Sequence, residues 1–312
     1  MKHKVYNKAR ESDSVDDWTA FCCMRKYVNR LTRTSYRNYI RNVCADSTKK
    51  FWSLIKKLKV DNHGIQSLKV NGNLITDNKL KANTLNKQFE SVFTHENLQN
   101  VPCIRNSPYL SMPEIDIRPE GVLKLLKNLD VNKASGPDDI SARLLKHGAT
   151  ELAPALTVIY KRSLESGLLP DDWRQANITP IFKKGDTTNA ANYRPVSLTS
   201  ISCKIMEHII HSNIMDHLDN NNILTDKQHG FRRNRSCESQ LILTTHDFAY
   251  ALDKRKQTDV ILLDFSKAFD VVPHKSLMQK LTYYGIHGST KNWICHFLMN
   301  RLQRVVIGGG TF

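Results

Sequence analysis

The sequence lacks any long apolar run and any set of paired cysteines. Its 312 residues contain no stretch of 18 apolar residues, which predicts that no helix spans a membrane, and the first residues, MKHKVYNKAR, are not typical of a signal peptide. The seven cysteines are scattered, with no CxxC pair and no metal-ligand spacing. An odd, dispersed set predicts reduced thiols in an intracellular protein of the cytoplasm or nucleus, not a secreted one.

Acidic residues are scarce relative to basic ones. The chain has 30 Asp and Glu against 46 Lys and Arg, a net charge of +16, and residues 1–60 alone hold 15 basic and 5 acidic residues. Such local basicity favours a polyanion as partner. Nucleic acid is favoured over a membrane because no lipid-type apolar face accompanies the charge. The alternative is a solvated helix face, and charge alone does not decide between them.

The length suits about two domains. Residues 1–58 are predicted to be helical and basic. Asn71-Gly72 lies between two short apolar runs and predicts a hairpin, and an amphipathic helix is expected over 79–92. Residues 96–115 are rich in Pro, Asn and Ser and predict a loop. We therefore expect a basic N-terminal extension over 1–115 and a second domain over 116–312.

One stretch carries the strongest chemical signal. Val260 to Leu263 is an unbroken apolar run, which predicts a strand buried on both faces. The run ends on Asp264, and a carboxylate at the end of a buried strand requires a cation, hydrogen-bond donors or a metal. Phe269 follows at a spacing that would fold its ring over the same pocket. The alternative for Asp264 is a helix cap or an ion pair with Lys267.

A second signal is a predicted hairpin with cations near its end. A short strand over 177–182 leads into Lys183-Lys184-Gly185, and the returning arm carries Arg194. Arginine offers a planar fork and lysine a point charge, the groups that a triphosphate requires. The alternative is a solvent-exposed hairpin with ordinary surface charges.

Two further segments have both a structural and a functional interpretation. Gly136-Pro137 followed by acidic residues predicts a turn that opens a helix. In the segment QHGFRRNRS, Gly230 permits close backbone approach, and the arginines suit contacts to phosphates. The structural alternative for these arginines is a basic start to the helix that Ser236 opens.

In their order along the chain, these segments resemble the motifs of reverse transcriptases of the LINE type (non-LTR, jockey-like). The matching runs are KASGPDDI, KKGD with YRPVSL, QHGFRRNRS and LLDFSKAFD. The resemblance covers about 119–312, and more loosely 1–95. It implies a mostly helical α/β fold, with the fingers and first part of the palm of a right-hand polymerase preceded by a basic helical linker. It also implies RNA-directed DNA synthesis by two-metal nucleotidyl transfer, with Mg²⁺, deoxynucleoside triphosphates, an RNA template and a DNA primer.

The resemblance assigns roles to individual residues. Asp264 and the carbonyl of Phe265 would bind metal, and Phe269 would exclude a ribose 2′-hydroxyl. The nucleotide would also contact the backbone amides of Ser266, Lys267 and Ala268, and the side chains of Arg194 and Lys183 or Lys184. The template side would comprise Gln228, Gly230, Phe231, Arg232 and Arg235.

Two motifs of the family are absent: the P-Q-G-rich helix start and the Y/F-x-D-D hairpin. No Asp-Asp pair follows Asp264, so we expect this chain, as a truncated form, not to polymerise, and the strand at 260–263 to be left as a bare edge. One alternative is a non-catalytic fragment that binds nucleic acid through the basic segment 21–60. A group II intron maturase is another, against which the N-terminal linker pattern argues.

Overall fold

The computed structural model describes residues 2–46, 52, 64–94, 96, 106–308 and 310–311. Two compact units are present, 1–63 and 64–312. The predicted border at 115/116 therefore falls inside the second unit. None of the helices within the described ranges is long and apolar enough to cross a membrane.

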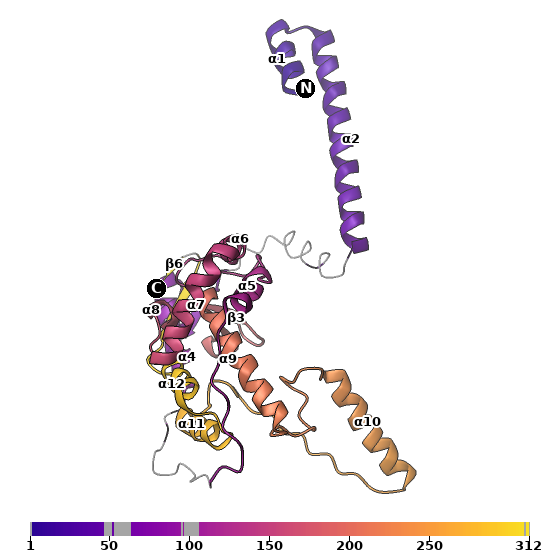
Figure 1. The fold of residues 1–312 in the computed structure, drawn as a ribbon. Helices are drawn as coiled ribbons and strands as arrows, with labels where there is room; N and C mark the ends of the chain where they lie inside the picture. The colour runs from indigo at the N-terminus through magenta and orange to yellow at the C-terminus, as the bar shows by residue number, and fades with distance from the viewer. Residues whose placement is uncertain are drawn as a thin grey trace. The chain divides into compact units, whose positions relative to one another are not determined.

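The first unit is a pair of helices, α1 (Lys2–Ser12) and α2 (Val15–Asp46), as the basic helical prediction requires (Figure 1). Aromatic side chains join them: the ring centroids of Tyr6 and Phe21 lie 5.3 Å apart. An ion pair of 2.8 Å links Lys8 to Asp17, and Ala9 is fully buried between the helices. These contacts hold only the first part of α2, and the side chains of residues 25–42, except Val28 and Ile40, are exposed.

A helical body forms the larger part of the second unit (Figure 1). Its buried side chains include Leu126, Tyr160, Met206 and Trp293. The elements are α5 (Pro119–Lys127), α6 (Ala142–His147), α7 (Ala149–Ser166), α8 (Asp171–Arg174), α9 (Ile201–Asn220), α11 (His274–Tyr283) and α12 (Gly288–Leu298).

Local sequence signals set the ends of these helices. Ser141 accepts a hydrogen bond from the Leu144 amide at 3.2 Å and begins α6, and Ser200 begins α9 in the same way. Gly167, in the left-handed conformation with φ of 70°, ends α7.

A four-stranded sheet of order β4-β3-β5-β6 completes the second unit. Strands β3 (Gln175–Phe182) and β4 (Tyr193–Leu198) are antiparallel, β5 (Leu302–Ile307) runs parallel to β3, and β6 (Gly310–Thr311) pairs with β5. The predicted hairpin at Asn71-Gly72 is confirmed as β1 (Leu68–Val70) and β2 (Asn73–Ile75).

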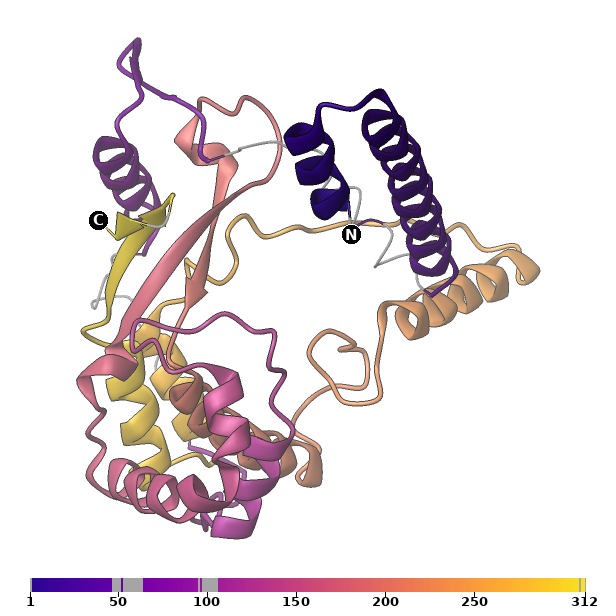
Figure 2. The same ribbon diagram turned by 90° about the horizontal axis from the view of Figure 1, so that it is seen from above.

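The helix α4 (Asn78–Glu90) lies beside the β5–β6 end of this sheet (Figure 2). Leu85 and Phe89 of α4 share a buried cluster with Ile178 and Val305 of the sheet. This cluster is the reason that residues 64–94 belong to the same compact unit as the sheet.

The prediction of a buried strand at 260–263 is wrong. These residues form no strand, and Ile261 and Leu262 are 83% and 90% exposed. The preceding helix, α10 (Cys237–Asp253), has no buried residue either. A strand buried on both faces requires neighbouring strands and covering layers. The described sheet does not provide these neighbours, and the sequence contains no x-D-D hairpin that could.

Candidate nucleotide and nucleic-acid site

The predicted basic hairpin is confirmed as β3 and β4. Its register pairs Phe182 with Tyr193 and Ile181 with Arg194, which places Arg194 one residue from the end of the ladder. Lys183, Lys184 and Arg194 are all exposed. The hairpin therefore presents three solvent-accessible cations near its tip.

Hydrogen bonds give the tip a defined conformation. Asp186 accepts hydrogen bonds from the amide and hydroxyl of Thr188, and these bonds lower the pKa of its carboxyl. The Tyr193 hydroxyl donates to the Thr187 carbonyl at 2.7 Å, and the Lys69 amide of β1 donates to the Thr188 carbonyl at 2.8 Å. The small β1–β2 sheet thus braces the loop next to the cations.

The arginines before α10 are partly used within the chain. Arg232 forms an ion pair with Asp219 at 3.0 Å and donates to the Thr225 carbonyl, and its side chain is only 13% exposed. Arg235 pairs with Asp226 at 3.0 Å. In this conformation both guanidinium groups hold the loop to its surroundings.

Other residues of the same loop are open to solvent. Gln228 and Gly230 are exposed, and a Cβ added at Gly230 meets nothing within 4 Å. Phe231 is 82% exposed and adopts a left-handed backbone with φ of 58°. A template-side role for these residues stays a prediction.

Asp264 lies in the exposed segment after α10. It has no hydrogen bond or ion pair with any residue that the structure describes, so neither the helix cap nor the Lys267 pair is formed. The chain then turns at Ser266–Val271, where the Asp270 amide donates to the Lys267 carbonyl at 2.9 Å. Phe265 is exposed as well.

The turn brings two predicted motifs together. The ring of Phe269 meets the ring of Phe231 edge to face, with centroids 5.7 Å apart. Phe269 also lines a cavity of about 650 Å³ with Glu96, His274 and Arg301. No motif in the sequence pointed to Glu96 or Arg301, because only the fold brings them to this cavity.

The described residues do not complete a two-metal centre. No group of three or more His, Cys, Asp or Glu side chains within the described ranges is arranged to hold a metal ion. Two-metal nucleotidyl transfer requires carboxylates that bridge both ions, and Asp264 is a single exposed carboxylate. This side-chain set does not fit such a centre on its own.

A family model described as "Reverse transcriptase (RNA-dependent DNA polymerase)" matches residues 181–310. The match begins on the β3–β4 hairpin and includes Asp264 and the turn of Phe269. Residues 181–310 thus match a reverse transcriptase domain. The resemblance to reverse transcriptases seen in the sequence is thereby confirmed.

Relatives of the chain confirm the resemblance to polymerases of non-LTR retrotransposons. It is 26% identical over 302 residues to "Probable RNA-directed DNA polymerase from transposon BS" of Drosophila melanogaster, which covers 89% of the chain and 33% of that protein. It is 26% identical over 269 residues to "RNA-directed DNA polymerase from mobile element jockey" of the same species, covering 83% and 29%.

A third similarity, to "Retrovirus-related Pol polyprotein from type-1 retrotransposable element R2" of Popillia japonica, is 30% over 146 residues and covers 46% of the chain and 20% of that protein. The chain thus spans about a third or less of the length of these relatives.

Reverse transcriptases generally use divalent metal ions.

Proposed function

We propose that this chain provides the fingers and the first palm segment of an RNA-directed DNA polymerase of a non-LTR retrotransposon. The observation that carries the proposal is the β3–β4 hairpin, on which Arg194, Lys183 and Lys184 are exposed around a braced tip. Cations held in this way suit the triphosphate of an incoming deoxynucleotide. The family match over the same hairpin supports it.

The nucleic-acid partners in this proposal are an RNA template and a DNA primer. Residues 116–312 act as the partial polymerase domain, and residues 1–115 precede it as a basic extension. Helix α2 has six cations between residues 18 and 45 and no acidic residue there, which supports contact with phosphates. In this proposal Phe231 and Phe269, whose rings pack edge to face, belong to the partial polymerase domain.

For the metal we propose Mg²⁺, because the donors expected here are all oxygen atoms. Asp264 and the Phe265 carbonyl are the residues of this chain that would hold it. Ser266 to Ala268 would face the triphosphate, and Phe269 would exclude a ribose. Since further carboxylates are required, we expect the 312-residue chain to bind substrates without extending a primer.

The test uses a deoxynucleoside triphosphate with a photoreactive group on its γ-phosphate. After irradiation of the full chain with a primer–template, we expect mass spectrometry to locate the label within residues 182–194. Loss of one charge-assisted contact in Arg194→Ala should lower labelling by roughly tenfold or more. As a control, Arg304→Ala removes a cation of the same sheet that is bonded to Asn177 at 2.7 Å, and labelling should persist.

Either of two labelling results would overturn the proposal. Labelling that is spread over the chain, or that is equally strong in Arg194→Ala, would remove the hairpin from the nucleotide site. Primer extension by the purified chain, lost in Asp264→Ala, would contradict the expectation that the chain lacks turnover.

A further inference from the structure

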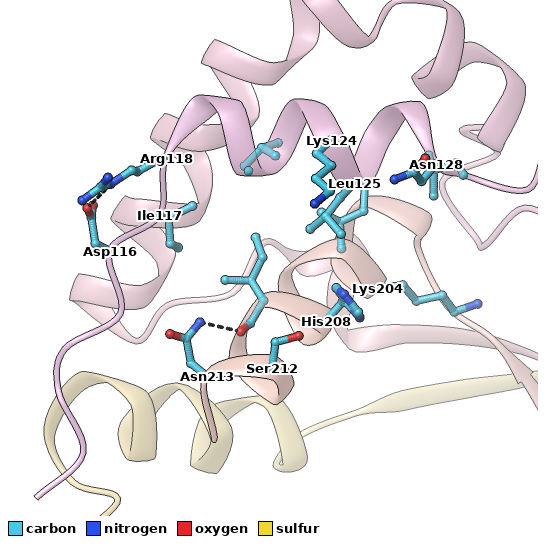
Figure 3. Close-up of a pocket in the computed structure, with 15 residues that line it drawn as sticks. Asp116, Ile117, Arg118, Lys124, Leu125, Asn128, Lys204, His208, Ser212 and Asn213 are labelled. Atoms are coloured by element: carbon cyan, nitrogen blue, oxygen red, sulfur yellow. Dashed lines mark hydrogen bonds and ion pairs between the residues drawn. The ribbon is translucent and has the colours of Figure 1, made fainter. Parts of the chain in front are cut away.

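A groove of about 670 Å³ lies between α5 and α9 in the helical body (Figure 3). Val122, Leu125 and Leu129 line it from the α5 side, and Ile205 and Ile209 from the α9 side. These spacings of three and four residues mean that each helix gives one continuous apolar face to the groove. The groove shares no lining residue with the hairpin, the loop before α10 or the turn of Phe269.

The charged rim of the groove is one-sided. Lys124 of α5 and Lys204 and His208 of α9 are exposed along it, toward the end opposite Arg118 and Asp116 (Figure 3). Arg118 and Asp116 form their own ion pair at 2.6 Å. The exposed basic groups near Lys124 therefore have no acidic counterpart among the residues that line the groove.

Gly121, in the first turn of α5, supplies a second observation. A Cβ added there would meet no heavy atom within 4 Å, and its φ is not among the positive values. The fold itself thus gives no reason for glycine, which costs a helix about 1 kcal/mol relative to alanine. A missing side chain at the groove wall lets a second backbone approach closely.

We propose that this groove docks an amphipathic α-helix of another protein, with its apolar stripe between α5 and α9 and carboxylates facing Lys124, Lys204 and His208. Two neighbouring helix faces that leave an open groove accept a third helix through interlocking side chains. An acidic edge, or the negative end of the helix dipole, complements the rim. An RNA backbone fits poorly, because phosphates are costly to bury against the Leu125 and Ile209 side chains.

The inference is independent of the polymerase proposal, and its test reads binding alone. The probe is a displayed library of helix-forming peptides of about 14 residues, or roughly four turns. Four positions on one face vary among Leu, Ile, Phe and Met, and the flanking positions vary between Glu and Lys. Selection runs in parallel on the full chain, on Gly121→Leu and on the double reversal Lys124→Glu/Lys204→Glu.

On the wild-type chain we expect Glu-flanked peptides to be enriched. The charge reversal should switch the preference to Lys, with affinity for a Glu-flanked peptide falling about tenfold or more through like-charge contacts. Gly121→Leu should block binding of both the Glu-flanked and the Lys-flanked peptides. Its thermal unfolding temperature should not be lower than that of the wild-type chain. The charge-reversal variant changes only exposed residues, so it stays informative if Gly121→Leu fails to fold.

Four outcomes would overturn the inference. They are no enrichment over the Gly121→Leu variant, enrichment of Lys-flanked peptides on the wild-type chain, indifference to charge reversal, and a dimer in light scattering that Gly121→Leu dissociates. The last would assign the groove to a second copy of this chain.

Discussion

Gly136 lies where the loop before α6 passes the start of α9. A Cβ at this position would sit 2.5 Å from the backbone of Thr199 and Ser200, so no side chain fits without moving main chain. In the family motif this glycine precedes the proline and acidic residues, and the contact favours its structural interpretation. The glycine allows the loop to pack on the N-terminus of α9.

We therefore expect Gly136→Ala to lower the free energy of unfolding by about 1–3 kcal/mol, the usual cost of overpacking. Urea denaturation followed by circular dichroism would measure it. The matched control is Gly121→Ala, where the added Cβ meets open space in a helix and should raise stability by about 0.5–1 kcal/mol. Equal effects of both substitutions would contradict the packing argument.

Glu207 of α9 is a largely buried acid beside Cys203. One carboxylate oxygen, Oε1, is buried with no hydrogen-bond partner among the described residues. Burial raises the pKa of the Glu207 carboxyl above its ordinary 4.5, although Cys203 and the charges of Arg301 and Lys204 oppose this. The folded state therefore binds this proton more tightly than the unfolded state does.

It follows that the contribution of Glu207 is most favourable below pH 4.5 and is lost as the pH rises through the raised pKa. Glu207→Gln should be more stable than the wild type at pH 7, with the difference vanishing below pH 4.5. Denaturation midpoints across this range would show it. A constant difference at every pH would indicate that the amide acts through packing instead.

At the scale of elements, α10 and the segment after it differ most from their neighbours. Four of their apolar side chains are each more than 60% exposed: Leu241, Leu252, Ile261 and Leu262. By contrast, α5, α7 and α9 share a cluster of buried apolar side chains. Helices that are apolar on several faces are typically buried. This surface is therefore available for contacts beyond those of the described residues.

The exposure of Leu262 is testable by a single substitution. In this structure Leu262→Asp should change the free energy of unfolding by less than about 0.5 kcal/mol, as for a surface site. In a strand buried on both faces the same change would cost more than about 3 kcal/mol. The control is Ile178→Asp on β3, whose side chain is 1% exposed and whose replacement should be severely destabilising.

On the scale of the whole molecule, the positive charge is uneven. Residues 1–60 hold 15 of the 46 basic residues against 5 of the 30 acidic ones. Within α2, residues Lys26, Arg30, Arg33 and Arg37 recur every three or four positions along one exposed face. Like charges at this spacing repel one another, so an anionic partner would stabilise the helix.

We expect Arg30→Gln/Arg33→Gln/Arg37→Gln to weaken binding of the full chain to single-stranded RNA. Three fewer phosphate contacts should lower the slope of log K against log salt by about 2. Fluorescence anisotropy with a labelled oligonucleotide over a salt series would measure it. The control removes three exposed cations elsewhere in the first unit, Lys4, Arg10 and Arg25. An equal loss in both triples would show that total charge, not this face, sets the affinity.

Local signals in the sequence were enough to predict most elements. Asn71-Gly72 and Gly167 act on backbone a few residues away, and the structure forms the expected hairpin turn at the first and a helix end at the second. The basic β3–β4 hairpin followed from two short apolar arms and the turn between them. The motifs that resemble those of reverse transcriptases could be recognised without the fold, because each is a short run of consecutive residues.

Only the tertiary structure decided which elements meet. It joined β3 to β5 across more than a hundred residues, grouped α4 with that sheet, and left Val260 to Leu263 outside it. It also engaged Arg232 with Asp219 and placed Phe269 on Phe231. The reason is physical: turns and caps depend on neighbouring residues, whereas burial of a strand or pairing of a charge depends on partners that only the folded chain brings together.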